Sequence, residues 1–250
     1  MAPGSEDRSV LTRTASAPDA VLAYGSDAEQ VADVRFAADA VERPLLVVVH
    51  GGFWRPAFDR VRLGPMTEAL AAAGWATVTP EYRRVPGRPG LAVGDVHAAL
   101  RAIAEWPEFV GRRVLLVGHS AGGHLALQAA ATLPPPHAPA GVLALAPVAD
   151  LRRAQELRLD GDAVQAFLGE DAAECPDLDP ALLPTPAGPI RIVHGTQDGI
   201  VPVELSESYV RHHPGAVLTP IASGHFALID PRSTAWLTVL RVLDDLRGAA

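Results

Sequence analysis

Lysine and asparagine are absent from this chain of 250 residues, so all 21 of its basic residues are arginine. Without lysine the chain cannot form a Schiff base with pyridoxal phosphate, and it cannot supply the lysine of a phosphate-binding P-loop. Without asparagine it cannot carry an Asn-linked glycan. We therefore expect any catalysis to depend on the side chains of the protein alone, with neither a cofactor nor a metal.

Cysteine and long apolar runs are also scarce. The single cysteine, Cys175, excludes an internal disulfide framework and is typical of a reducing cytoplasm. Proline and glycine interrupt every apolar stretch before it reaches the length of a membrane span. The first residues lack the apolar core of a secretory signal. We therefore expect a cytoplasmic protein with no membrane partner.

The charge balance is acidic, with a formal net charge of −8. An acidic chain argues against a nucleic-acid partner. A composition of 48% hydrophobic and 20% charged residues suits one globular α/β domain over residues 1–250. The sequence leaves monomer and homodimer open.

The hydrophobic pattern predicts strands that alternate with helices, which is typical of a mostly parallel sheet with helices on both faces. The predicted strands cover residues 31–36, 45–49, 76–82, 114–117, 141–145, 190–193 and 216–221, of which the first alternates and reads as antiparallel. The predicted helices cover about 63–73, 91–106, 125–131 and 234–246. Residues 1–18 are polar and predict a loosely ordered start, and residues 149–188 predict a cap-like insertion with one helix around Val164.

One pentapeptide, Gly118-His119-Ser120-Ala121-Gly122, lies between an apolar strand and a helix-forming stretch. This is the context of a G-x-S-x-G nucleophile elbow, in which a tight turn presents the serine above the sheet. The N-terminal N–H groups of the following helix point towards that serine. Ser120 is therefore a candidate nucleophile.

A serine hydroxyl needs a base and an acid that orients it, and in this fold class the chain order is Ser, acid, His. Asp198 follows the predicted strand 190–193, and His225 follows 216–221. Both would reach the same sheet edge as Ser120, where His225 takes the proton and Asp198 fixes the imidazole. Asp150, after an earlier strand, is the alternative acid.

A nucleophile also needs donors where negative charge develops. The segment His50-Gly51-Gly52-Phe53-Trp54 follows the buried strand 45–49 and is similar to an HGGG-type oxyanion loop. We expect the N–H of Gly52 or Phe53, together with that of Ala121, to face the oxyanion. Each of these motifs has an ordinary reading as a turn, and their occurrence together, in the required order, favours a serine hydrolase.

The remaining histidines have plainer interpretations. We expect His50 to brace its own loop, and His212 and His213 to be surface groups. A metal site at His119 and His124 lacks a third ligand at a suitable spacing. Cys175 has no motif around it and reads as an inert thiol.

Together, the oxyanion loop, the elbow that continues through Gly123-His124-Leu125-Ala126, the segment from His194 to Pro202 and the ending Gly224-His225-Phe226 resemble an α/β-hydrolase. More narrowly, the aromatic-Trp end of the oxyanion loop is similar to that of the kynurenine formamidase (arylformamidase) group. This resemblance covers about residue 24 to the end of the chain.

By that resemblance the enzyme would hydrolyse N-formyl-kynurenine to kynurenine and formate, in tryptophan breakdown. Ser120 would attack the formyl carbon, and water would then clear the formyl-enzyme. Phe53 and Trp54 could give a flat apolar wall for the aryl group, although Trp54 could equally pack beneath its loop. An arginine could bind the substrate carboxylate, but the sequence singles none out.

Two other functions stay open. A carboxylesterase acting on small acyl esters would use the same Ser120, Asp198 and His225. A non-catalytic binding protein with a hydrolase-like fold is the third reading, although binding alone does not require such a set of residues.

Overall fold

The computed structural model of the chain describes residues 6–37 and 43–249. Its central feature is an eight-stranded sheet with the strand order β1-β2-β4-β3-β5-β6-β7-β8. The strands are β1 (Ala20–Ala23), β2 (Val31–Arg35), β3 (Leu45–Val49), β4 (Thr77–Pro80), β5 (Val114–His119), β6 (Gly141–Leu145), β7 (Ile190–Gly195) and β8 (Val217–Ile221). Strands β3 to β8 run parallel, and β1 and β2 pair antiparallel.

The predicted mostly parallel sheet is therefore confirmed, including the antiparallel strand near residue 31. Strand β1 has no counterpart in the sequence prediction. It is four residues long and alternates between half-buried and exposed positions, and so short an edge strand carries little pattern.

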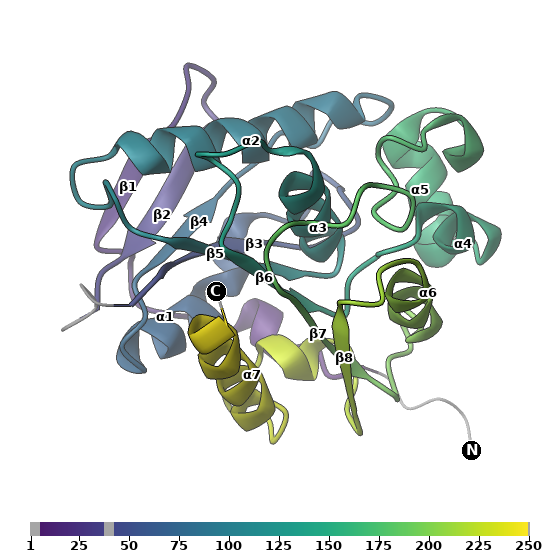
Figure 1. The fold of residues 1–250 in the computed structure, drawn as a ribbon. Coiled ribbons are helices and arrows are strands. Elements are labelled where there is room, and N and C mark those ends of the chain that lie inside the picture. Colours follow the sequence, from purple (N-terminus) through teal and green to yellow (C-terminus); the bar gives the residue numbers. More distant parts are fainter. Residues whose placement is uncertain (1–5, 38–42, 250) are drawn as a thin grey trace.

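Helices cover both faces of the sheet, as Figure 1 shows. The principal helices are α1 (Gly64–Ala72), α2 (Pro89–Glu105), α3 (Ala121–Thr132), α6 (Glu204–His212) and α7 (Trp236–Ala249). α2 and α3 lie above the sheet in Figure 1, and α1 and α7 lie below it. None of the helices in the described part of the chain combines the length and apolar character needed to cross a bilayer.

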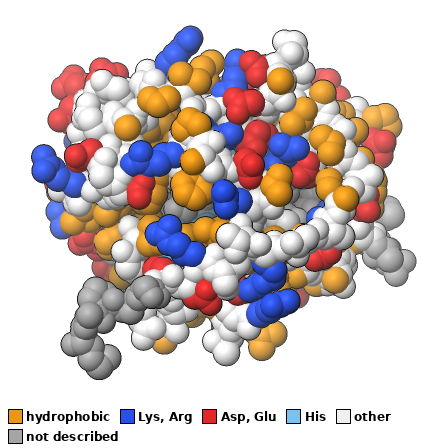
Figure 2. All heavy atoms as spheres, turned by 180° about the vertical axis from the view of Figure 1, so that it is seen from behind, with side chains coloured by type: hydrophobic (Ala, Val, Ile, Leu, Met, Phe, Trp, Pro, Cys, Tyr) orange, Lys and Arg blue, Asp and Glu red, His pale blue; other side chains and the backbone are white. Residues whose placement is uncertain are grey.

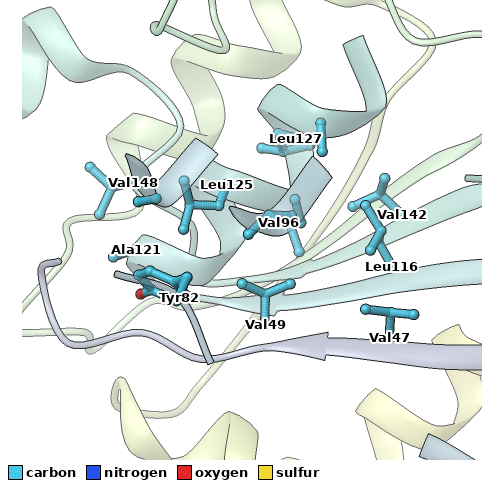
Figure 3. Close-up of a cluster of buried hydrophobic side chains, with 14 of the residues drawn as sticks. Val47, Val49, Tyr82, Val96, Leu116, Ala121, Leu125, Leu127, Val142 and Val148 are labelled. Carbon is cyan, nitrogen blue, oxygen red and sulfur yellow. The ribbon is translucent and has the colours of Figure 1, made fainter. Parts of the chain in front are cut away.

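The central strands bury every residue because both of their faces are covered. Neighbouring residues on a strand point to opposite faces, so Leu116 joins the core under α2 and α3 while Leu115 joins the core over α1 and α7. Figure 3 shows the first of these cores, in which Leu116 lies beside Val142 of β6, and which also contains Val96 of α2 and Leu125 of α3.

The insertion between β6 and β7 forms two short helices, α4 (Leu151–Glu156) and α5 (Leu159–Leu168), and the 3-10 turn η4 (Ala172–Glu174). The sequence predicted only the one around Val164. α4 has only six residues, most of them polar, so its sequence shows no helical hydrophobic periodicity. Its start is stabilised by an N-cap, in which Asp150 accepts a hydrogen bond from Arg153 N–H at 2.8 Å.

The start of the chain differs from the expectation of a loose segment over 1–18; residues 1–5 lie outside the described part. Ser9–Thr12 form the 3-10 turn η1, and Val10 is buried in the core over α1 and α7. Arg13 makes two hydrogen bonds with Asp230, at 2.5 and 3.0 Å. One buried valine and one bidentate ion pair anchor a segment whose composition is polar.

The surface carries both signs of charge. On the face shown in Figure 2, arginine and acidic side chains are interspersed with apolar ones. Mixed charge of this kind suits a globular domain surrounded by water.

The central core gives a first prediction. Leu116→Ala removes a buried side chain from the middle strand β5, and we expect the free energy of unfolding to fall by about 2–5 kcal/mol. Leu237→Ala on α7, where the leucine is 73% exposed, is the matched control and should stay within about 0.5 kcal/mol. Urea denaturation measures both. Similar losses in the two variants would contradict this account of the core.

Candidate active site

Ser120 lies at a sharp turn between β5 and α3. Its backbone has φ +57° and ψ −121°, a strained conformation for a residue with a side chain. Ser120 N–H donates to the Leu145 carbonyl at 2.9 Å, and its own carbonyl accepts from His124 N–H at 3.1 Å and Val148 N–H at 3.2 Å. These three hydrogen bonds hold the strained turn that the elbow motif predicts.

The glycines beside Ser120 are required by close backbone contacts. A Cβ at Gly118 would lie 2.3 Å from the Gly122 carbonyl oxygen, and one at Gly122 would lie 2.1 Å from that of Val49. The elbow therefore packs directly against strand β3 and the loop that follows it.

Asp198 and His225 meet as the sequence predicted for an acid and its histidine. His225 Nδ1 lies 2.6 Å from Asp198 Oδ2, while Asp198 Oδ1 accepts from the N–H groups of Ile200 and Val201, each at 2.8 Å. Burial would raise the pKa of Asp198, but hydrogen bonds from His194 and His225 outweigh it and hold that pKa well below its usual range. The carboxylate is ionised at neutral pH.

Ser120 and His225 line one pocket. A hydrogen bond between Ser120 Oγ and the His225 imidazole is not among those that the described residues make, and bonds of this kind often tighten only around bound substrate. The walls are largely apolar, and two arginines also line the pocket. The lining includes Arg8, Leu11, Gly52, Phe53, Phe58, Arg62, Ile200, Phe226 and Ile229.

The oxyanion loop lies against the elbow. A Cβ at Gly51 would come within 2.9 Å of Ser120 Cβ, and Gly52, at φ +108°, would place one 2.4 Å from the Phe58 side chain. Within the described chain, neither Gly52 N–H nor Phe53 N–H donates to a protein acceptor. Ala121 begins α3, so the helix does not use its N–H either. All three donors that the sequence indicated are thus uncommitted.

A buried polar network supports this loop from below. His50 Nε2 lies 2.8 Å from a Glu81 carboxylate oxygen, and the Tyr82 hydroxyl donates to the His50 carbonyl at 2.9 Å. The His50 and Tyr82 rings stack at 4.3 Å, and Arg84 also binds the Glu81 carboxylate. His50 Nδ1 also lies 2.9 Å from the Gly51 carbonyl oxygen, so His50 contacts its own loop, as expected. Sequence reasoning missed Glu81, although a carboxylate at the end of an apolar strand was a signal.

The two aromatic residues of the oxyanion loop, Phe53 and Trp54, have different surroundings. Phe53 lines the Ser120 pocket, but Trp54 does not. Trp54 is buried and stacks on Phe167 of α5 at 4.3 Å, with its edge contact to His124 at 5.1 Å. Of the two readings that the sequence gave Trp54, packing is the one that the structure shows. The wall proposed for an aryl substrate retains only Phe53.

The alternative acid, Asp150, is occupied elsewhere. It caps α4 and accepts a hydrogen bond from the Ser208 hydroxyl at 2.6 Å. Its chemistry is that of a helix cap, and Asp198 is the carboxylate that binds His225.

Other histidines have structural contacts. His119 Nε2 lies 3.2 Å from the His225 carbonyl, and His124 Nε2 lies 2.8 Å from that of Leu178. Burial, with His225 nearby, lowers the pKa of His119 to about 3, and burial lowers that of His124 to about 4, so both are neutral donors. The prediction that His213 lies at the surface is wrong. His213 is buried, and its Nε2 lies 3.0 Å from the Pro180 carbonyl oxygen. The sequence around the end of α6 does not indicate that the segment at Pro180 lies against this histidine.

Cys175 is a buried thiol. Burial, followed by the neighbouring Glu170, raises its pKa to about 11. A thiol protonated at neutral pH is a poor nucleophile, in agreement with the inert role expected of it.

Acid should destabilise the network under the oxyanion loop. Burial would raise the pKa of Glu81, but hydrogen bonding from His50 and Arg60 N–H and the charge of Arg84 lower it from 4.5 to about 2. A carboxyl whose folded pKa is depressed stabilises the fold above its unfolded pKa and loses that contribution as the pH falls towards the folded value. Glu81→Gln should therefore flatten the fall in the free energy of unfolding between about pH 5 and pH 2.

Urea denaturation at a series of pH values measures this slope. Glu29→Gln is the control, because Glu29 is about half exposed where it meets the same Arg84. Parallel curves for Glu81→Gln and the wild type would rule out the linkage.

Comparison with known proteins agrees with this geometry. The BD-FAE family model matches residues 33–135. The chain is 28% identical over 243 residues to the esterase LipC of Mycobacterium tuberculosis. The aligned segment covers 84% of this chain and 60% of LipC. It is 29% identical over 194 residues to the probable carboxylic ester hydrolase LipM of the same organism, covering 67% of the chain and 44% of LipM. The chain thus spans only part of either relative.

Among solved structures, esterase B from Lactobacillus rhamnosis, inhibited by a tributyrin phosphonate, aligns with a TM-score of 0.73 at 21% identity, over 94% of this chain and 88% of that one. A likeness at this identity defines the fold. The sheet order, the elbow at Ser120 and this alignment together show that the chain has the α/β-hydrolase fold.

Proposed function

We propose that the protein is a serine hydrolase of the carboxylesterase type that cleaves small acyl esters. Ser120 is the nucleophile, His225 the general base and Asp198 the residue that orients it. The observation that carries the proposal is the 2.6 Å contact between His225 and Asp198 beside the pocket that holds the strained Ser120.

The reaction follows from these positions. As Ser120 Oγ attacks the ester carbonyl carbon, its proton passes to His225 Nε2, and a tetrahedral oxyanion forms. Collapse of this intermediate breaks the bond to the leaving oxygen, which takes the proton from His225. The acyl group remains on Ser120. A water molecule then gives a proton to His225 and attacks the acyl carbon, and the released serine regains that proton while the carboxylic acid leaves.

Fixed charge and dipoles favour each charged state along this path. The ionised Asp198 stabilises the imidazolium of His225 without itself taking the proton. The N–H of Ala121 and that of Gly52 or Phe53 are the donors for the oxyanion, and each such donor contributes about 10²–10³ in rate. The N-terminus of α3 adds its positive end at the same point.

The relatives favour an ester over an aryl formamide as the substrate. LipC is named an esterase and LipM a probable carboxylic ester hydrolase. Trp54 packs on α5 and does not line the pocket, so it does not supply the aryl wall expected of it. A largely apolar pocket beside Ser120 suits a small acyl chain and its alcohol. N-formyl-kynurenine, the substrate implied by the resemblance of the loop motif, is the formamide against which ester hydrolysis is compared below.

Substitution of the triad tests the residue roles. We expect Ser120→Ala and His225→Ala to lower kcat for p-nitrophenyl acetate by about 10⁴ or more, with little further loss in the double variant. Asp198→Asn should cost about 10²–10⁴ because the imidazole loses its orientation. Asp150→Asn is the matched control and should remain near wild type. A larger loss from Asp150→Asn than from Asp198→Asn would overturn the acid assignment.

Paired substrates test the reaction class. The kcat/KM for p-nitrophenyl acetate should exceed that for N-formyl-kynurenine at least tenfold, and a higher value for the formamide would return the assignment to an arylformamidase. A fluorophosphonate probe should label the wild type and leave Ser120→Ala unlabelled. No labelling of the wild type would favour the non-catalytic binding protein.

A further inference from the structure

Glu6 joins the two loops that carry Asp198 and His225. Its Oε1 accepts a hydrogen bond from Gly199 N–H at 2.9 Å, and its Oε2 accepts one from His225 N–H at 2.9 Å. Gly199 directly follows Asp198, and the two loops leave different strands, β7 and β8. A single carboxylate therefore bridges the backbone of both triad loops.

We propose that Glu6 is a positioning residue for the triad, which sets the relative placement of the Asp198 and His225 loops through their backbone amides. The inference rests on the hydrolase function proposed above. Glu6 acts through these two residues and takes no part in the transfer of protons.

Three hydrogen-bond partners among the described residues hold His225, two at its backbone and one at its ring. His119 lies 3.2 Å from its carbonyl, Asp198 binds Nδ1 at 2.6 Å, and Glu6 binds its N–H. Hydrogen bonds from N–H groups to a carboxylate are stronger than bonds between neutral partners. Because a small misplacement of a catalytic group can lower a rate severalfold to a hundredfold, these bonds bear on kcat.

Gly224 leaves the space that Glu6 occupies. A Cβ at Gly224 would lie 2.4 Å from Glu6 Oε2 and within 3.1 Å of two other atoms of the same carboxylate. Nothing else lies among the three nearest atoms. The absence of a side chain at the residue before His225 therefore leaves room for the carboxylate.

The segment that carries Glu6 is fixed at several points. Val10 is buried, and Arg13 pairs with Asp230. The Arg8 guanidinium lies 5.4 Å from the centroid of the Phe226 ring, next to His225. Arg8 also lines the substrate pocket. The carboxylate is delivered to the loops by an anchored segment.

Substitution of Glu6 is the first test. Glu6→Gln keeps one acceptor but turns an NH₂ group towards the other backbone N–H, whereas Glu6→Ala removes both acceptors. We expect kcat for p-nitrophenyl acetate to fall severalfold in Glu6→Gln and on the order of tenfold or more in Glu6→Ala, with KM within about twofold. Asp7→Asn, an equal loss of charge at a carboxylate that accepts from Ser9 N–H of the η1 turn, should match the wild type.

Gly224→Ala supplies a second, independent variant. Its new methyl group should displace the Glu6 carboxylate and lower kcat as Glu6→Ala does. In the Glu6→Ala background the clash is gone, so Gly224→Ala should add little. Additive losses in the double variant would show that Gly224 acts by another route and would overturn the proposal.

A readout that needs no turnover separates this proposal from the proposed function. The downfield proton resonance of the His225 Nδ1–H to Asp198 hydrogen bond should weaken or exchange faster in Glu6→Ala and stay unchanged in Asp7→Asn, with Asp198→Asn identifying the signal. If the wild type hydrolyses no ester but the resonance responds to Glu6, the function fails and the positioning role stands. An unchanged resonance, an unchanged kcat, or a loss confined to KM or to thermal stability would overturn the positioning role.

Discussion

Parallel strands of one sheet end at the same edge, and the site depends on that constraint. Strands β3, β5, β7 and β8 deliver the oxyanion loop, Ser120, Asp198 and His225 to this edge from four distant parts of the chain. The sheet brings the groups close, but each loop needs its own local device to hold its final geometry. At Ser120 that device is a strained turn with three hydrogen bonds; at His225 it is a set of three partners.

Two buried carboxylates divide the work of supporting the site. Asp198 binds His225 Nδ1, while Glu81 binds His50, the first residue of the oxyanion loop. Both have depressed pKa values because hydrogen-bond donors surround them. An ionised carboxylate in a buried position is costly without such partners, so the loops and their donors stabilise one another.

Local patterns in the sequence predicted most of the fold and that Ser120, Asp198 and His225 meet at one edge of the sheet. Apolar runs marked the buried strands, and the motifs around Ser120, Asp198 and His225 each occupied a strand end. The same patterns could not decide which side of a loop a residue faces. Trp54 and Phe53 are neighbours in one motif, yet one packs on α5 and the other lines the pocket. Glu6 was out of reach of sequence reasoning because its partners lie 193 and 219 residues away.

The stacking of Trp54 on Phe167 couples the oxyanion loop to α5, whose Asp160 lines the Ser120 pocket. Under the proposed function, an acyl chain bulky enough to displace α5 would also disturb Trp54 and the neighbouring donor at Phe53. Oversized substrates would then still bind but acylate Ser120 more slowly. The enzyme would select against them in kcat and not in binding affinity.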